Sequence, residues 1–340
     1  MDSLTQIVLG AAVGEVVYGK RVGAKAALWG AIGGTIPDLD VFCMFLFDPI
    51  HAKLVHRGFS HSLLFVALFT PVFGLLIHLI TKQKFEFKSW MYLAFWSMVT
   101  HPLLDIFTNY GTQLFWPFDL RIAFNSVFVV DPLYTVPFLF VLIWALCMKR
   151  TSRFRRKLNW FGIIYSTMYL VWGLCVKQYL VTDANSFFQS KNIYPTRIEV
   201  GPMPLTSFYW SYIMEDQQNY YLSYRSLFSS TADLEIDTIK KNKFLMEGLV
   251  WPKNEHPELI KRFTDNFYAV QLKRNKLTII DMRFGTNKQI TGGIENKPIF
   301  TFGMNLEDRV VKSLDKRQRF DAYKNINLPY YWNKVFAKYE

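Results

Sequence analysis

Six apolar segments occupy the first half of this 340-residue chain, and several approach the roughly 20 residues that a helix needs to cross a bilayer. The first is short enough to be tilted or re-entrant. Gly33, Gly34 and Pro37 interrupt the second, so we expect its end to be irregular. The pattern predicts a polytopic α-helical membrane domain of about six segments over residues 1–182. The segments run from Leu4 to Tyr18, Ala24 to Phe47, Ser60 to Thr81, Trp90 to Asn109, Phe128 to Met148 and Trp160 to Leu180.

The composition changes after about Val181, where Lys, Asn, Asp and Glu become frequent and aromatic residues are spread between them. Residues Pro257 to Phe267 have a helical pattern. We therefore predict a soluble α+β domain over residues 183–340, which is within the usual size of a domain. Strand composition is found from Phe208 to Ile213, Tyr220 to Tyr224, Leu277 to Phe284 and Pro298 to Phe302.

The formal net charge is +12, from 39 basic and 27 acidic residues. Much of the excess lies in short loops between apolar segments, and the sequence contains no nucleic-acid-binding motif, so membrane orientation explains it better than nucleic-acid binding does. One set of alternate loops holds 12 cations and the other holds 3, which predicts that both termini and the C-terminal domain are extracytoplasmic. The first set is Lys20, Arg21, Lys25, Lys82, Lys84, Lys88, Lys149, Arg150, Arg153, Arg155, Arg156 and Lys157; the second is Lys53, Arg57 and Arg121.

Four short polar islands lie in or beside the apolar segments: Glu15, PDLD (residues 37–40), HRGFSHS (residues 56–62) and HPLLD (residues 101–105). Carboxylates and imidazoles are costly in hydrocarbon, and they persist there mostly when they pair, bind an ion or take part in chemistry. On the predicted topology the last three islands meet at the outer end of the helices. We therefore expect one shared site, with Glu15 fitting less well because it lies near the inner end.

The residue types in these islands suit a divalent metal, because Asp and neutral His are ligands of zinc and similar ions. His101 and Asp105 are four residues apart, which places them on one face of a helix. Pro102 disfavours regular helix at this point, so we expect a kink or a restart. Asp38 and Asp40 either share one ion, or one of them binds while the other orients a histidine.

The HRGFSHS run adds His56 and His61, of which His61 is the better ligand candidate because Ser60 can cap the helix that follows. Arg57 has a planar guanidinium that suits an anionic group such as a phosphate. Anchoring to lipid headgroups is the alternative role for Arg57.

Glu15 is a candidate general base or a further metal ligand, since apolar surroundings disfavour the charged form of a carboxylate and thereby suit it to proton transfer. The alternative is a structural pair with Lys20 or Arg21 near the cytoplasmic interface.

The ordered set PDLD, HRGFSHS, HPLLD and GTQLFWP (Gly111 to Pro117) resembles the bacterial inner-membrane metal-dependent hydrolases of the YdjM-like family. The opening MDSLTQIVLGAAVGE is similar to one branch of that family, so the resemblance covers roughly residues 1–135. It implies a multi-span hydrolase that binds a divalent metal, zinc foremost, with manganese or iron as alternatives. Many relatives have a His where this chain has Gln6, so either the site uses fewer histidines or Gln6 supports a ligand. The candidate ligands carried over are Asp38, Asp40, His56, His61, His101 and Asp105.

These observations favour an enzyme of the bacterial inner membrane, in which metal-activated water attacks an ester or phosphoester of a lipid or lipid-linked substrate at the outer face. A metal or ion transporter is one alternative, because carboxylates and histidines in membranes also form ion paths. A non-catalytic scaffold whose soluble domain binds an envelope partner is another. The sequence lacks the remaining motifs of phosphatidic-acid phosphatases and the HExxH motif of intramembrane proteases.

Overall fold

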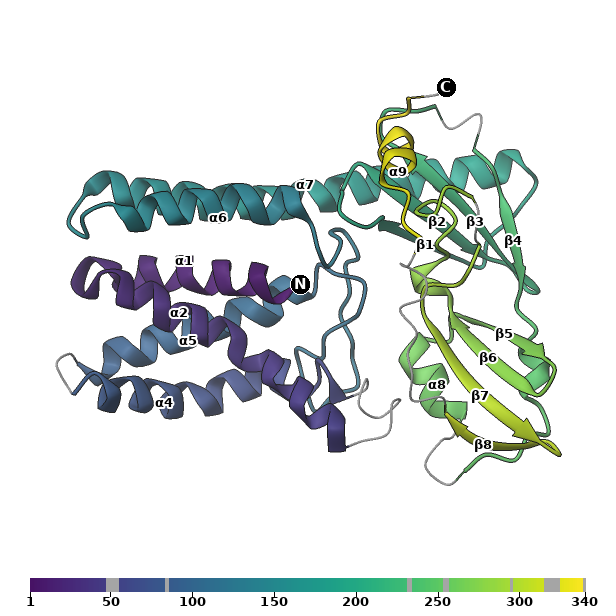
Figure 1. Ribbon diagram of the computed structural model, residues 1–340, viewed down its shortest axis with the longest axis horizontal. Coiled ribbons are helices and arrows are strands. Elements are labelled where there is room, and N and C mark those ends of the chain that lie inside the picture. Colours follow the sequence, from purple (N-terminus) through teal and green to yellow (C-terminus); the bar gives the residue numbers. More distant parts are fainter. Residues whose placement is uncertain are drawn as a thin grey trace. The chain divides into compact units, whose positions relative to one another are not determined.

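The computed structural model describes residues 1–46, 55–82, 86–230, 234–252, 257–293, 296–314 and 325–338. The chain divides into two compact units, one formed mainly by residues 1–176 and the other mainly by residues 177–340. Figure 1 shows that the first unit is a bundle of helices and that the second carries the two β-sheets. The prediction of a helical N-terminal region followed by a domain rich in β-sheet is therefore confirmed.

Each predicted apolar segment contains a helix. The helices are α1 (Ser3–Val22), α2 (Ala24–Thr35), α4 (Leu63–Ile80), α5 (Phe87–Asp105), α6 (Pro132–Cys147) and α7 (Arg153–Ser190), the last of which continues into the second unit. Among the described residues between α2 and α4 are two 3-10 helices, η1 (Ile36–Leu46) and η2 (Phe59–His61).

Within the described residues, α4 and α7 are long and apolar enough to cross a membrane, and α6 is a shorter apolar helix. A span of about 30 Å of hydrocarbon requires roughly 20 residues, which explains why the 16-residue α6 falls short by itself. A helical region with membrane-spanning candidates is thus present. The six-segment topology stays a prediction.

Small residues allow α1 and α2 to pack with their backbones in close contact. A Cβ atom added to Gly34 of α2 would lie 2.7 Å from the carbonyl oxygen of Gln6 and 3.1 Å from Cα of Gly10. Gly14 and Gly30 face the partner helix in the same manner. This spacing of small residues every four positions is typical of helix pairs in membranes. It brings the first turn of α1 beside the last turn of α2.

The second apolar segment changes from α-helix to 3-10 helix at Ile36, next to Pro37, as the glycines and proline predicted. Of the kink or restart expected at Pro102, the restart does not occur. Helix α5 continues through Pro102 without a restart and ends at Asp105. His101 and Asp105 therefore occupy the last turn of one continuous helix.

The second unit contains two antiparallel sheets of four strands, each in simple sequential order. Tyr220 and Phe267 lie in its core in an edge-to-face contact, with ring centroids 4.8 Å apart. The first sheet holds β1 (Arg197–Pro202), β2 (Tyr209–Glu215), β3 (Asn219–Ser226) and β4 (Asp237–Lys240); the second holds β5 (Tyr268–Lys273), β6 (Lys276–Asp281), β7 (Thr301–Glu307) and β8 (Val310–Leu314). The short helices are η3 (Lys243–Met246), α8 (Pro257–Thr264), η4 (Met282–Phe284) and α9 (Leu328–Val335).

The sequence located five of these elements, β2, β3, β6, β7 and α8, but misplaced some of their ends. The predicted strand from Leu277 to Phe284 stops at Asp281, where the chain turns into the 3-10 helix η4. The predicted strand from Pro298 to Phe302 begins only at Thr301. Met282 and Phe284 lie beyond the first boundary and Ile299 and Phe300 before the second, so apolar residues stand on both sides of each boundary and did not mark the change in backbone.

Candidate metal centre

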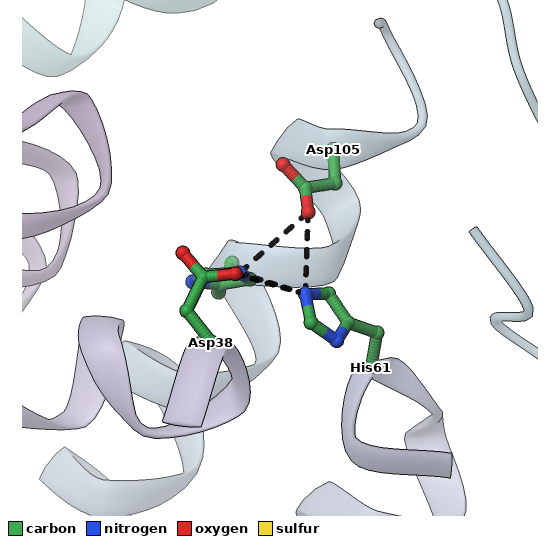
Figure 2. Close-up of side chains that lie close together, drawn as sticks. Asp38, His61 and Asp105 are labelled. Carbon is green, nitrogen blue, oxygen red and sulfur yellow. Dashed lines mark hydrogen bonds and ion pairs between the residues drawn. The ribbon is translucent and has the colours of Figure 1, made fainter. Parts of the chain in front are cut away.

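Four of the predicted ligands come together in the first unit. Asp38 lies in η1, His61 in η2, and His101 and Asp105 in the last turn of α5. Each offers one ligand atom, and the four atoms all lie within 4.8 Å of one another. In Figure 2, Asp38, His61 and Asp105 point toward a common centre from separate elements. Both histidines and Asp105 are buried, whereas the Asp38 side chain retains 26% of its exposure.

The distances within this cluster match those expected around a tetrahedral metal. The two Nε2 atoms of His61 and His101 are 3.2 Å apart. Asp38 Oδ1 lies 3.3 and 3.4 Å from them, and Asp105 Oδ2 lies 3.4 and 3.6 Å from them. Metal–ligand bonds of about 2.0–2.1 Å in tetrahedral geometry would place the ligand atoms about 3.3 Å apart. The five separations that involve a histidine are therefore close to those around a zinc-sized ion.

A second observation supports a cation at this position. Oδ2 of Asp105 is buried and accepts no hydrogen bond from the residues that the structure describes, although the Arg57 guanidinium lies 3.3 Å from it as an ion-pair partner. A buried carboxylate oxygen left unsatisfied is unfavourable, because desolvation removes its interaction with water. A metal ion would satisfy this oxygen, and it would also explain why two imidazole nitrogens face each other.

The tautomer of His101 is set by the backbone of α2. Its Nδ1 lies 2.6 Å from the carbonyl oxygen of Gly34, so this nitrogen carries the proton and donates it. The lone pair is then on Nε2, which faces the cluster. The close packing of α1 on α2 positions this carbonyl, because Gly34 is one of the residues at the helix contact.

Asp40 orients His61 at Nδ1, the ring nitrogen that does not face the cluster. Ser60 Oγ donates a hydrogen bond of 2.6 Å to Asp40 Oδ2 and lies 3.0 Å from His61 Nδ1, which is itself 3.4 Å from the same carboxylate oxygen. Asp40 also lies 2.9 Å from Nδ1 of His56. Of the two arrangements open for PDLD, this geometry matches the one in which Asp38 faces the cluster and Asp40 supports a histidine.

Asp40 and His56 are outside the four-residue cluster, but together with Asp38 they form a second group of possible ligands within 4.8 Å. His56 is partly exposed, with 23% of its side chain accessible. Asp38 is therefore common to both groups. All six ligands carried over from the family resemblance belong to one group or the other, whereas Glu15 belongs to neither.

The predicted capping role of Ser60 was wrong. The residue at the N-cap of α4 is Ser62, whose hydroxyl accepts a hydrogen bond of 3.0 Å from the Phe65 amide. Ser60 lies two residues too early, and its hydroxyl donates to Asp40 instead.

Arg57 lies in the wall of the site. Its Nε is 3.3 Å from Asp105 Oδ2, its Nη1 donates to Thr108 Oγ1 at 2.7 Å, and its guanidinium lies over the ring of Tyr110. The Arg57 amide also donates to Asp40 Oδ2 at 3.2 Å. Arg57 thus contacts Asp105 of the four-residue cluster and Asp40 of the second group, and it adds positive charge beside both carboxylates.

Gln6 supports the metal cluster by donating hydrogen bonds to the end of α5. Its Nε2 donates to Asp105 Oδ1 at 3.0 Å and to the carbonyl oxygen of His101 at 3.3 Å. The amide is buried against the last turn of α5. Gln6 therefore fixes the carboxylate of Asp105, and of the two alternatives for this position the structure matches the second.

Glu15 does not lie at the cluster. Arg155 of α7 forms a two-pronged ion pair with it, with Nε and Nη2 each 2.6 Å from one carboxylate oxygen. Both side chains are buried. Glu15 follows Gln6 by nine residues on α1, which corresponds to about 13 Å along the helix. Glu15 thus lies away from the metal ligands, which does not support its candidate role as general base or further ligand. It forms a structural ion pair, the alternative considered for it, but with Arg155 in place of Lys20 or Arg21.

Two contributors to the site had no signal in the sequence. The carbonyl of Gly34 is a backbone group, so no residue type identifies it as the acceptor for His101. Thr108 lies three residues beyond HPLLD, and only the fold brings it to Arg57. A Thr one turn after a motif is common enough that its position alone would not have identified it.

Comparisons with known proteins identify the family to which the first half of the chain is similar. A model of the YdjM inner membrane protein family matches residues 1–180. YfhP, an uncharacterised protein of Bacillus subtilis (strain 168), is 28% identical over 153 residues, which are 42% of this chain and 46% of that protein. The chain thus matches less than half the length of this relative. The comparison with solved structures found no match. The family match includes all four clustered residues and ends before β1.

Proposed function

This chain belongs to the YdjM inner membrane protein family, and we propose that it is a membrane-bound metal-dependent hydrolase. The observation that carries the proposal is the convergence of Asp38, His61, His101 and Asp105. Two neutral imidazoles and two carboxylates balance the charge of a divalent ion. We expect zinc, with manganese or iron as alternatives, because this mixed nitrogen and oxygen set suits all three.

The protein groups around the cluster hold its donor atoms in place. A bound divalent cation supplies Lewis-acid chemistry there, which activates water near neutral pH and polarises an ester or phosphoester. Gly34 fixes the proton of His101 on Nδ1, and Gln6 fixes Asp105 through Oδ1. Ser60 and Asp40 constrain His61 from its Nδ1 side. Such supporting contacts keep ligands in the geometry that binding requires.

Arg57 and Asp38 are the residues that we assign to the substrate side. Asp38 is the most exposed of the four clustered residues, so the approach to the donors is from its side. Arg57 carries a positive charge 3.3 Å from Asp105, which favours an anionic group such as a phosphoester near the cluster. We therefore favour a phosphoester over a neutral ester.

The second group of ligands allows either one or two ions. If Asp38, Asp40 and His56 bind a metal themselves, the protein holds two ions that share Asp38. If they only support His61, the protein holds one. The metal stoichiometry distinguishes these alternatives.

We place the site at the outer face of the inner membrane. The support for this placement is the Lys and Arg asymmetry between alternate loops, 12 against 3. A site at this depth favours a lipid or lipid-linked substrate, because such molecules present their ester groups at the membrane surface. Lys and Arg then dominate the cytoplasmic loops at the opposite end of the helices.

The test is metal content by mass spectrometry on the full-length, detergent-purified protein, for wild type, His61→Ala and His101→Ala. His78→Ala is the matched control, because His78 lies in the last turn of α4, with its ring against Phe87. We expect near-stoichiometric metal in wild type and in His78→Ala, and loss in the other two variants. Hydrolysis of phospholipids and acyl lipids should follow the same pattern. A wild-type protein that binds no zinc, manganese or iron after reconstitution would refute the hydrolase and favour the scaffold.

A further inference from the structure

An ordered loop beside the metal cluster exposes four large apolar side chains. The loop is closed at its base by two hydrogen bonds of 3.0 Å between Thr112 and Ile122. Between them the exposed side chains are Phe115, Trp116, Phe118 and Leu120, and Phe118 is 72% exposed. We call residues 112–122 the aromatic loop. Apolar side chains gathered on a surface indicate an interaction site rather than a solvated loop.

Hydrogen bonds hold the aromatic loop in a defined conformation. Gln113 Nε2 donates to Asp119 Oδ1 at 3.0 Å, the Trp116 amide to the Gln113 carbonyl at 3.2 Å, and the Phe118 amide to the Phe115 carbonyl at 3.0 Å. The loop therefore presents its apolar side chains at fixed positions.

The same loop is tied to the segment that carries His61. The Gln113 amide donates to the carbonyl of Arg57 at 2.9 Å, and the Leu63 amide donates to the carbonyl of Leu114 at 3.0 Å. These bonds lie on either side of His61 along the chain. The aromatic loop and the metal cluster are thus parts of one local structure.

The aromatic side chains continue from this loop onto a candidate membrane-spanning helix. Trp116 contacts Phe59 edge to face, with ring centroids 4.9 Å apart, and Phe59 contacts Phe65 at 5.4 Å. Phe65 stacks on Phe69 at 5.2 Å, one turn further along α4. Helix α4 also exposes Leu68, and it is long and apolar enough to cross a bilayer. We call Trp116, Phe59, Phe65 and Phe69 the aromatic track.

From this continuity we infer that the aromatic loop is a lipid-docking surface, and that it lies within the leaflet on the side of the metal cluster. Aromatic side chains are favoured at the boundary between headgroups and acyl chains. Acyl chains lying along the aromatic track would place a headgroup ester at the level of the cluster. The substrate class that this surface selects is an amphiphile with at least one acyl chain. Only the identification of this amphiphile as substrate rests on the proposed function.

The experiment measures the membrane depth of position 118 without any assay of activity. A nitroxide is attached to Phe118→Cys in the full-length protein in lipid nanodiscs, with the three native cysteines replaced by Ser. Collision rates with oxygen, which concentrates in hydrocarbon, are compared with those of a water-soluble nickel chelate. Leu68→Cys on α4 is the lipid-facing reference, and Lys273→Cys in β5 is the aqueous reference. Leu120→Cys, 54% exposed in the wild type, gives an independent position in the loop.

We expect oxygen collisions to exceed nickel collisions at positions 118 and 120, with a ratio near that of position 68. A ratio near that of position 273 would overturn the inference, because the loop would then be in water. Low collision rates with both reagents would also overturn it, since another part of this chain or a second copy would then cover the loop. Metal content measured on the same samples tests the proposed function separately, because lipid contact at position 118 without bound metal would refute the hydrolase alone.

Discussion

The substitution Gly34→Ala tests whether the α1–α2 contact builds the metal cluster. The added Cβ would lie 2.7 Å from the carbonyl oxygen of Gln6, whereas ordinary contacts begin at 3.4 Å, so the two helices must separate locally by about 0.7 Å. Overpacking of this kind costs about 1–3 kcal/mol of stability. The shift also exceeds the tolerance of about 0.5 Å within which a functional site must be held.

Two hydrogen bonds to α5 connect this shift to the metal ligands. Gln6 on α1 holds Asp105, and Gly34 on α2 holds His101. Whichever helix moves, one of these bonds is stretched. Loss of such a supporting contact lowers metal affinity about 10–100-fold, and we expect a decrease in this range for Gly34→Ala.

The assay is competition with a chelator of known affinity, combined with thermal unfolding in detergent. The matched control is Gly162→Ala in α7, where the added Cβ would lie 2.9 Å from the ring of Phe138 in α6. This control crowds a helix contact that carries none of the clustered residues, so it should lose stability while keeping wild-type metal affinity. Wild-type affinity in Gly34→Ala, or an equal loss of affinity in both variants, would refute the reasoning.

Two further predictions rest on single contacts, and a third on the bound metal itself. Asp40→Asn removes the carboxylate behind His61 and should reduce metal affinity about 10–100-fold in the chelator competition, and an unchanged affinity would contradict its orienting role. Glu15→Ala leaves buried Arg155 unpaired and should lower the free energy of unfolding by about 3–5 kcal/mol with metal stoichiometry retained; metal loss in a folded variant would return Glu15 to the site. Removal of the metal by a chelator should lower the free energy of unfolding by about 2.7 kcal/mol, relative to protein in a free metal concentration 100 times the dissociation constant. A melting temperature that does not change with chelator would argue against a bound ion.

The sequence by itself determined the helical character of the first half and the β-rich character of the second. Both follow from composition and periodicity, which depend on neighbouring residues along the chain. It also identified Asp38, His61, His101 and Asp105, because carboxylates and imidazoles in apolar sequence require a compensating interaction wherever the chain folds. The rule locates the ionisable side chains that need a compensating interaction, and it does so without knowledge of their neighbours in the fold.

The same rule could not say which interaction compensates each group. Glu15 has the same local environment in sequence as a ligand would have, and yet it pairs with Arg155, which is 140 positions away. Ser60 and Ser62 are equally plausible caps from composition, and only the start of α4 decides between them. Pairing partners and exact helix ends depend on distances across the fold.

Tertiary structure alone decided how the site is assembled. Three helical elements converge at donor separations of 3.2–3.6 Å between His61, His101 and the two aspartates. The close approach of α1 and α2 brings Gln6 and the carbonyl of Gly34 to the last turn of α5. The type of a residue is given by the sequence, and it predicts which ions or groups the side chain can bind. Which groups meet at bonding distance depends on helix packing, and packing is a property of the whole bundle that no single segment encodes.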